Sequence, residues 1–292
     1  MAATAKTAAR RIAFQGFPGA YSHLACRHAF PRMTPLPCVS FEDAFAAVRN
    51  RRAALAMIPI ENSVAGRVAD VHHLMPQSRL HIVAEHFQRV NHHLLAVPGA
   101  SLKTIRTVHS HVQALDQCRT ITRELGLKRA VAADTAGAAA EVAAAGDVTR
   151  AAIASALAGE IYGLKSLRKN IEDAEHNTTR FVVLASKPFN PDRRKGTVLT
   201  TFIFRVQSVP AALYKALGGF ATNGVNMTKL ESYLIGGYFE AAQFYCDVEG
   251  HPEDPPLKRA LAELKFFSRE LTILGSYYAH PYRSRGRPDE SD

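Results

Sequence analysis

Short apolar runs alternate with segments of helical periodicity along the first 185 residues of the chain. Apolar runs that stop at glycine or proline predict buried strands, and apolar positions spaced three and four apart predict amphipathic helices. Ser40, followed three residues later by Asp43, approximates a capping box at the start of one helix. The first group of expected elements comprises strands at 12–16, 37–39 and 55–60 and helices at 21–30 and 41–49.

A second group of the same kind follows an extended apolar segment at 81–97. Strands alternating with helices of this length indicate βαβ units and mostly parallel sheets. Two such α/β lobes, joined at 81–97 and again at 170–180, would leave a cleft between them, where small ligands bind. The second group comprises strands at 107–110, 130–133, 151–154 and 181–185 and helices at 111–125, 135–145 and 156–162.

The pattern changes after a segment rich in proline and charge at 186–196, which we interpret as a linker. The order strand, helix, strand, strand, helix, strand beyond it is the ferredoxin-like split βαβ arrangement. We therefore expect an α/β domain of two lobes at 11–185, a βαββαβ domain at 197–282 and a polar, disordered tail at 283–292. The expected elements of the second domain are strands at 198–206, 225–234, 239–248 and 271–278 and helices at 210–222 and 257–266.

Composition narrows the class of protein. The 292 residues suggest roughly two domains, and no apolar run approaches the ~20 residues that span a bilayer, so we expect no membrane association. Lys and Arg outnumber Asp and Glu by 36 to 26, a balance compatible with anionic partners. The basic residues stand in short pairs and are not interleaved with aromatic residues, so we expect no binding of nucleic acid.

The cysteines and histidines do not form a recognisable metal or disulfide pattern. Four cysteines lie far apart without a CxxC pair, and the paired histidines lack an HExxH motif or a suitably spaced acidic residue. Residues 1–9 lack the apolar segment of a secretory signal. We therefore expect a cytoplasmic protein without a metal.

Candidate functional residues stand where strands give way to helices. Gly19, Ala20 and Tyr21 form a glycine-containing corner whose backbone N–H groups either hold an anion or only make a tight turn. Asn62 and Ser63 follow a strand's carboxyl end with Glu61, a place for ligands or for a helix cap. Two further groups of this kind are Ser110, His111 and Gln113 in the second lobe and Asn177, Thr179 and Arg180 at the return between lobes.

These segments, taken in order, resemble prephenate dehydratase over residues 12–185. The motifs that carry the resemblance are GFPGAYSH at 16–23, IPIENS at 58–63, HSHVQALDQC at 109–118, Asp134-Thr135, AAIAS at 151–155, IED at 171–173 and NTTRF at 177–181. Residues 217–233 look like part of the ACT regulatory domain found in that family. The resemblance implies a two-lobed fold like that of type II periplasmic binding proteins, with the active site between the lobes.

The resemblance also implies an activity: conversion of prephenate to phenylpyruvate with loss of water and carbon dioxide, in phenylalanine biosynthesis. It implies no cofactor and a homodimer or homotetramer. In the family the Thr of the TRF motif, here Thr179 followed by Arg180 and Phe181, assists loss of the ring hydroxyl, and Glu61 is a possible proton source behind it. Arg180 offers a planar fork suited to a substrate carboxylate. The residues expected to bind substrate are Gly19, Ala20, Tyr21, Asn62, Ser63, Ser110, His111, Gln113 and Asn177.

The resemblance further implies L-phenylalanine as an allosteric effector of the ACT domain. The residues expected to bind it are Leu213, Asn223, Gly224, Val225, Asn226, Glu231 and Ser232. The sequence departs from the family pattern at Tyr233 and Leu234, where many members have Arg-Pro, and at 65–67, where Arg67 would add an anion contact. Two alternatives stay open: a non-catalytic amino-acid-sensing protein, and an enzyme that acts on arogenate.

Overall fold

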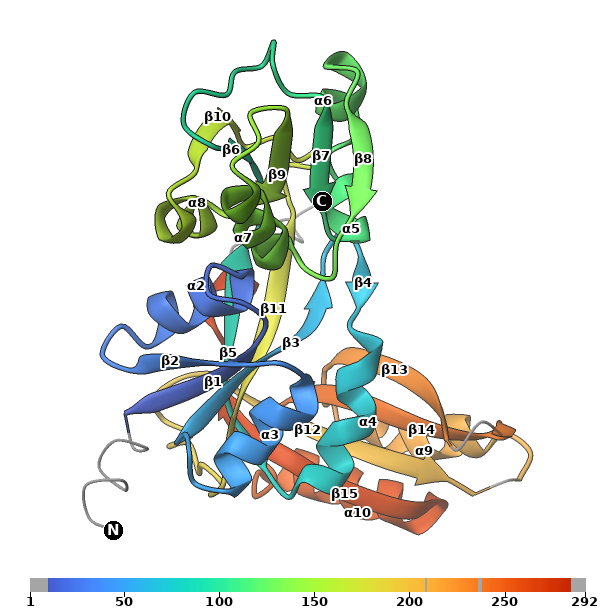
Figure 1. Cartoon of the computed structure of the whole chain (residues 1–292). Helices are drawn as coiled ribbons and strands as arrows, with labels where there is room; N and C mark the ends of the chain where they lie inside the picture. The colour runs from blue at the N-terminus through green and yellow to red at the C-terminus, as the bar shows by residue number, and fades with distance from the viewer. Residues whose placement is uncertain (1–9, 208, 236–237, 285–292) are drawn as a thin grey trace. The chain divides into compact units, whose positions relative to one another are not determined.

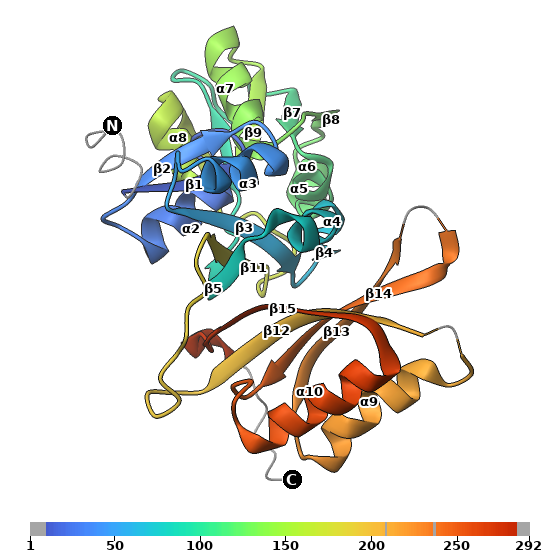
Figure 2. The same ribbon diagram turned by 90° about the horizontal axis from the view of Figure 1, so that it is seen from below.

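The computed structural model of the chain describes residues 10–207, 209–235 and 238–284. These residues form two compact units. The first holds the described residues up to His72 together with His86–Phe181, and the second holds His73–Glu85 together with the described residues from Val182 onward. Figures 1 and 2 show the elements of both units. Among the described residues, no helix has the length and apolar character needed to span a membrane.

The first unit contains a sheet in the order β2-β1-β3-β11-β5, with the short β4 paired antiparallel to β3. β1 pairs parallel with both β2 and β3, as the βαβ alternation predicts. Strands β5 and β11 continue past the boundary into the second unit. The elements are β1 (Arg11–Gln15), α2 (Tyr21–Ala29), β2 (Thr34–Cys38), α3 (Phe41–Arg49), β3 (Leu55–Asn62), β4 (Gly66–Arg67), α4 (Ala69–Ser78), β5 (His81–Arg89) and β11 (Thr178–Ala185).

A second sheet in the same unit has the order β10-β6-β9-β7-β8. β7 pairs parallel with β8 and β9, whereas β6 pairs antiparallel with β9 and β10. The elements are β6 (His93–Ala96), β7 (Thr107–Ser110), α5 (Val112–Asp116), α6 (Arg119–Glu124), β8 (Lys128–Val131), α7 (Thr135–Ala145), β9 (Arg150–Ala154), α8 (Ala156–Tyr162) and β10 (Lys165–Lys169).

Both faces of the second sheet are covered by apolar side chains. Along β9, Ala151 and Ile153 belong to one buried cluster, while Ala152 and Ala154 belong to another. Successive side chains of a strand point to opposite faces, so a strand buried on both sides reads as a continuous apolar run. This burial explains why the run at 151–154 signalled a strand in the sequence.

Side-chain caps and glycines set the helix ends. Ser40 Oγ accepts a hydrogen bond from the Asp43 N–H at 3.1 Å, as the capping pattern predicts. Asp134 and Ser155 cap α7 and α8 in the same way. Gly146 and Gly163, at φ of 63° and 68°, end these two helices in the left-handed conformation.

Several elements differ from the sequence-based expectation. The helix expected at 111–125 is two helices, because Cys118 leaves the helical conformation and the Asp173 carboxylate accepts the N–H groups of Arg119 and Thr120. That carboxylate caps α6 from a distant part of the chain, where local periodicity carries no signal. The short β4, the helix α4 and the edge strand β10 were not expected, and β8 begins two residues before the predicted strand at 130–133.

The described residues of the second unit include a four-stranded antiparallel sheet in the order β13-β14-β12-β15. Helices α9 and α10 lie on one face of it (Figure 2), over a cluster containing Phe202, Phe204, Phe220 and Leu264. The βαββαβ order is therefore confirmed. Residues 283 and 284, expected in the tail, belong to a 3-10 helix; 285–292 lie outside the described residues. The elements are β12 (Val198–Val206), α9 (Ala212–Thr222), β13 (Met227–Ile235), β14 (Tyr238–Glu249), α10 (Pro255–Phe267), β15 (Ser268–Tyr278) and η1 (Pro281–Ser284).

Candidate active site

A cavity of about 560 Å³ lies in the first unit, and both of its sheets contribute to the wall. Pro59 and Asn62 line it from β3, and Thr179 and Phe181 line it from β11. The opposite wall comes from the second lobe and includes His111, Gln113, Gln117 and Thr135. Its volume suits a small organic ligand. The cleft expected between the two lobes is confirmed.

Three helices begin at this wall. Tyr21 and Ser22 open α2, Gln113 lies in the first turn of α5, and Thr135 opens α7, and all four line the cavity. The first N–H groups of a helix have no partner within the helix, and the aligned peptide dipoles favour negative charge there. Side chains cap α5 and α7, whereas Ala20 makes no side-chain cap for α2. The α2 N-terminus therefore offers backbone donors to an anion in the cavity.

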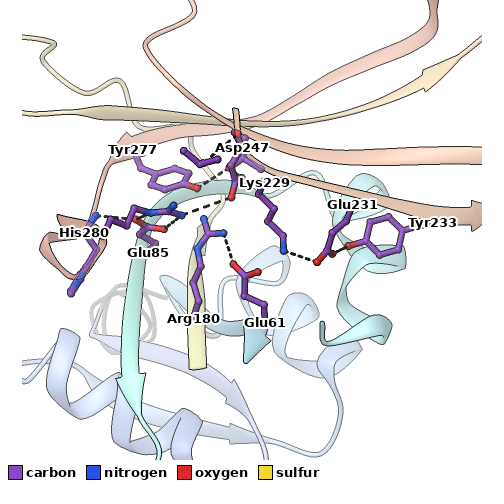
Figure 3. A network of polar contacts seen from close by, with 12 residues as sticks. Glu61, Glu85, Arg180, Lys229, Glu231, Tyr233, Asp247, Tyr277 and His280 are labelled. Atoms are coloured by element: carbon purple, nitrogen blue, oxygen red, sulfur yellow. Dashed lines mark hydrogen bonds and ion pairs between the residues drawn. The ribbon is translucent and has the colours of Figure 1, made fainter. Parts of the chain in front are cut away.

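Strand β11 separates two neighbouring residues of the TRF motif. Thr179 and Phe181 line the cavity, whereas Arg180 between them does not. Alternation along a strand turns Arg180 to the other face, where its Nη1 lies 2.9 Å from Glu61 Oε1 (Figure 3). The Arg180 side chain is 3% exposed. Arg180 thus offers its Nη1 to Glu61.

The expectation that Arg180 clamps a substrate carboxylate disagrees with this geometry, whereas the role of Glu61 as a proton source behind Thr179 stays a prediction. Neither residue lines the cavity, and each is the ion-pair partner of the other. The Arg180 side chain is buried and the Glu61 side chain is 32% exposed, so the pair sets a buried cation beside a partly solvated carboxylate. The sequence pattern placed both residues next to the site, but it did not show on which face of the sheet each side chain lies.

Thr179 belongs to a continuous series of side-chain hydrogen bonds. Asn62 Nδ2 donates to Thr179 Oγ1 at 3.0 Å and to Asn177 Oδ1 at 2.8 Å. Asn177 Nδ2 donates to Gln117 Oε1 at 2.9 Å, and His92 Nε2 lies 3.0 Å from the same oxygen. His92 Nδ1 lies 2.9 Å from the Tyr21 hydroxyl. We call these six residues the amide chain: Thr179, Asn62, Asn177, Gln117, His92 and Tyr21.

Burial governs the protonation of the two ring groups at the end of the amide chain. Desolvation lowers the pKa of His92 and outweighs the Gln117 hydrogen bond and the Glu172 charge, which both raise it. Desolvation likewise raises the pKa of the Tyr21 hydroxyl well above its usual value, with Cys118 and Glu172 adding to the rise. At neutral pH, His92 is therefore a neutral imidazole and Tyr21 a neutral phenol.

Charges at the cavity are few. Among the lining residues that the structure describes, Arg67 on β4 is the one permanent cation and Asp134 is the one carboxylate. Asp134 Oδ1 accepts the Gly137 N–H at 2.6 Å and so caps α7. Arg67, at the departure from the family pattern at 65–67, lines the cavity, and its role as an anion contact stays a prediction. Within the described ranges, no group of three or more His, Cys, Asp or Glu side chains is placed to hold a metal ion.

Comparison with known proteins decides the family. The family model of prephenate dehydratase matches residues 12–189. The chain belongs to the prephenate dehydratase family. The resemblance carried by the sequence motifs over 12–185 is thereby confirmed, and this family performs a lyase-type dehydration.

Three relatives extend the comparison. A bifunctional N-acyl-homoserine lactone acylase/prephenate dehydratase of Komagataeibacter europaeus is 55% identical over 276 residues, 94% of this chain and 98% of that protein. An Arabidopsis thaliana chloroplastic arogenate dehydratase/prephenate dehydratase is 42% identical over 91% of this chain and 71% of its own length. The crystal structure of an Arthrobacter aurescens prephenate dehydratase in complex with L-Phe is 30% identical, with a TM-score of 0.85 over 92% of this chain and 90% of that one.

The site residues expected for this prephenate dehydratase family member fall into two groups. Those that line the cavity are Ala20, Tyr21, Asn62, His111, Gln113, Thr179 and Phe181. The others support the wall from behind. Ser110 Oγ donates to the Ile153 carbonyl at 2.6 Å. Ser63 Oγ donates to the His176 carbonyl and accepts the Thr178 N–H, which ties β3 to the start of β11.

Gly19 and Asn177 also lie outside the cavity wall. Gly19 contacts α8 of the second lobe, where Ser155 Oγ donates to its carbonyl at 2.5 Å. Asn177 is 1% exposed and belongs to the amide chain. The structure adds lining residues that the prediction did not name, among them Ser22, Gln117 and His92. Gln117 lies one helical turn beyond Gln113, so spacing carried a signal for it; His92 carried none.

The residues expected to bind an effector lie in the second unit. Asn223 Nδ2 donates to the Gly219 carbonyl at 2.8 Å, and its Oδ1 accepts Arg259 Nε at 2.7 Å, so its side chain closes the end of α9. Gly224 has a φ of 64°, and the Asn226 carbonyl accepts the Glu249 N–H. Glu231 pairs with Lys229 at 2.7 Å and accepts a hydrogen bond from Tyr233 (Figure 3). Their role in binding an effector stays a prediction.

Proposed function

We propose that this protein converts prephenate to phenylpyruvate, with loss of water and carbon dioxide. The observation that carries the proposal is the Thr179 hydroxyl, which lines the cavity and accepts a hydrogen bond from Asn62. As that bond occupies a lone pair of Oγ1, the hydroxyl proton can be donated to the ring hydroxyl that leaves. A donor placed where negative charge develops lowers the barrier to departure.

The walls of the cavity suit the two carboxylates of prephenate. The α2 N-terminus and Arg67 supply positive potential at separate places on the wall. Phe41, Pro59, Val90 and Phe181 supply apolar surface. A reacting carboxylate against apolar surface loses solvation, which favours its departure as carbon dioxide, while the other carboxylate is held. Aromatisation of the ring makes the overall step strongly downhill.

Arogenate is the second candidate substrate, because one lining residue would favour it. Arogenate carries an ammonium group where prephenate has a keto oxygen, and Asp134 is a carboxylate in the wall. The Arabidopsis thaliana relative carries both activities in its name. Turnover of the two substrates at equal concentration decides the preference, with phenylpyruvate detected by its enol absorbance in base and phenylalanine by chromatography.

The acylase activity in the name of the Komagataeibacter relative serves as a third arm of that assay. Nucleophilic acyl transfer needs a hydroxyl or thiol within hydrogen-bond reach of a base. Among the described lining residues, Tyr21 has a hydroxyl in hydrogen-bond contact with a histidine, His92. Burial raises the pKa of that hydroxyl, which makes it a poor nucleophile. We therefore expect prephenate turnover to exceed hydrolysis of an N-acyl-homoserine lactone. No prephenate turnover by the folded protein would favour the amino-acid-sensing alternative.

We further propose that the second unit is an ACT domain through which L-phenylalanine inhibits a homo-oligomer. The βαββαβ order and the relative crystallised with L-Phe support this proposal. A coupling of about 1–3 kcal/mol is typical of allosteric linkage. Titration calorimetry and turnover of the intact protein with millimolar L-phenylalanine test it together. Neither heat nor a change in rate would rule out the phenylalanine response.

A further inference from the structure

The hydrogen-bond directions from Asn62 through Asn177 and Gln117 to His92 Nε2 follow from one fixed end. Asn62 Oδ1 accepts the backbone N–H groups of Val64 at 3.0 Å and Ala65 at 2.8 Å. A backbone N–H only donates, so the oxygen of the Asn62 amide must face these two groups. Its nitrogen then necessarily faces Thr179 Oγ1 and Asn177 Oδ1.

The orientation of the Asn62 amide determines the orientations of the Asn177 and Gln117 amides. Because Asn177 Oδ1 accepts from Asn62, Asn177 Nδ2 is the donor to Gln117 Oε1. Since Gln117 Oε1 can only accept, the proton between it and His92 belongs to His92 Nε2. A neutral His92 therefore carries its proton on Nε2, and its Nδ1 is bare. The Tyr21 hydroxyl lies 2.9 Å from that Nδ1 and donates to the Asn91 carbonyl at 2.8 Å, so its single proton faces two acceptors.

The orientation of Asn62 also determines where the Thr179 hydroxyl can donate its proton. Thr179 Oγ1 receives a proton from Asn62 and has one proton of its own to donate. Asn62 offers that proton no acceptor, because its oxygen is occupied by Val64 and Ala65. Thr179 lines the cavity, so a bound substrate oxygen is the acceptor the geometry offers.

We infer that Asn62 is a positioning residue that directs the Thr179 proton into the cavity, and that Asn177, Gln117 and the Nε2–H tautomer of His92 hold Asn62 in this orientation. The chain acts by orienting amide groups and does not transfer a proton between them. The effect on Thr179 rests on the proposed dehydratase reaction, whereas the His92 tautomer does not depend on it.

Two nearly isosteric variants separate hydrogen-bond direction from charge. Asn62→Asp replaces the donor facing Thr179 by an acceptor, so the Thr179 proton turns toward the new carboxylate. Gln117→Glu adds the same charge to the same cavity wall but keeps an acceptor facing both His92 and Asn177. Both variants should raise KM for the anionic substrate. We expect kcat to fall about 100-fold or more in Asn62→Asp, the usual cost of one lost transition-state donor, and less than tenfold in Gln117→Glu.

Equal losses of kcat in the two variants, or a kcat of Asn62→Asp within tenfold of wild type, would overturn the inference. Wild-type turnover of prephenate is measured first, so a failure of the proposed function is recognised before the variants are compared. Circular dichroism of both variants confirms that they fold.

The tautomer gives a second test that needs no activity. Long-range ¹⁵N–¹H correlation spectra of the intact wild-type protein distinguish Nε2–H from Nδ1–H imidazole, and the His92 signals are assigned by their loss in His92→Gln. We expect a neutral Nε2–H ring between pH 6.5 and 8. A neutral Nδ1–H ring in that range would contradict the direction of the amide chain, and an imidazolium would overturn the tautomer inferred for His92.

Discussion

Gly19 lies against the backbone of Ala158, so closely that a Cβ on Gly19 would stand 2.7 Å from the Ala158 Cα. Gly19 belongs to the loop before α2, and Ala158 lies in the first turns of α8. Ser155 Oγ and the Tyr162 hydroxyl donate to the carbonyls of Gly19 and Pro18. The loop of the first lobe is thus bonded to a helix of the second, immediately before the cavity residue Tyr21. Gly19 has no side chain and so allows this close contact between the two lobes.

Gly19→Ala should therefore destabilise the protein by more than its backbone conformation alone would cost. Gly19 has a φ of 96°, and Gly99, with a φ of 93° and nothing within 4 Å of its added Cβ, is a matched control. Strained backbone and overpacking each cost about 1–3 kcal/mol. Because the backbone strain is common to both sites, we expect Gly19→Ala to lower the free energy of unfolding by about 1–3 kcal/mol more than does Gly99→Ala. Chemical denaturation measures both, and equal losses would exclude the contact with Ala158 as the cause.

The role of Thr179 predicts a loss of rate with little loss of stability. Thr179→Ala removes one hydroxyl from a cavity wall, and we expect kcat to fall roughly 10²–10³-fold. Thr179→Ser keeps a hydroxyl that Asn62 can orient and should retain much of the rate. Single-turnover kinetics with prephenate measure both variants. Wild-type kcat in Thr179→Ala would show that the hydroxyl does not assist the leaving group.

Arg67 lies in the cavity wall and Arg180 does not, so we expect Arg67 to be the arginine that binds a substrate carboxylate. Arg67→Ala should raise KM for prephenate about tenfold with a smaller change in kcat, since binding lost equally in ground and transition states appears in KM. Exposed Arg32, outside the cavity wall, serves as the control for net charge. Steady-state kinetics at constant ionic strength measure both. An unchanged KM in Arg67→Ala would leave the α2 N-terminus as the principal anion contact.

Hydrophobic periodicity predicted the order of strands and helices, because the buried face of each element determines which of its positions are apolar. The run at 151–154 is buried on both faces, and the Ser40 cap forms as expected. The break at Cys118 was not predictable from local pattern, because the carboxylate that caps α6 comes from Asp173, more than fifty residues later. Pairing in β10 and β4 likewise depends on partners remote from the local pattern.

The sequence motifs identified residues of the site, but they did not show to which face of the sheet each side chain points. Thr179 and Asn62 were expected in the cleft and line it. Arg180 was expected there because it adjoins Thr179, yet strand alternation turns it to Glu61. His92 was not expected because a buried histidine in an apolar segment has no distinguishing neighbour in sequence. Its partner Gln117 lies 25 residues away in the chain, beyond the reach of local pattern.

A buried ion pair in the second unit predicts that Arg283 stabilises the fold. Glu85 is fully buried and accepts two hydrogen bonds from Arg283, at 2.7 and 2.8 Å, and a third from the His280 N–H (Figure 3 labels Glu85 and His280). Removing one partner of such a pair costs about 3–5 kcal/mol, because the remaining charge stays buried.

We therefore expect Arg283→Met to lower the free energy of unfolding by roughly that amount. Arg283→Lys keeps the charge without the planar fork and should recover part of it. The double variant Arg283→Met with Glu85→Gln should also be more stable than Arg283→Met alone, because Glu85 is then neutral and only Asp247, 3.9 Å from Arg283 in the wild type, keeps a buried charge there. Chemical denaturation of the intact protein compares the three. A double variant no more stable than the single one would show that the charge of Glu85 is not the cause.

The lowered pKa of His92 predicts how stability depends on pH. Burial holds the folded-state pKa of His92 below the ordinary histidine value of about 6.5, so below pH 6.5 the unfolded chain binds a proton that the folded chain resists. The free energy of unfolding should therefore decline as pH falls from 6.5, by at most about 1.4 kcal/mol per pH unit for this group. Above about pH 7.5 the ring is neutral in both states and contributes no slope.

His23, His93 and His109 also have lowered pKa values, so the contribution of His92 is the difference in the free energy of unfolding between wild type and His92→Gln. We expect that difference to shrink as pH falls from 7 to 5, since the glutamine cannot titrate. His176→Gln, at an exposed ring, is the control for replacing a histidine by glutamine. Urea denaturation at half-unit pH intervals measures all three, and parallel curves for wild type and His92→Gln would show that His92 is not held neutral by the fold.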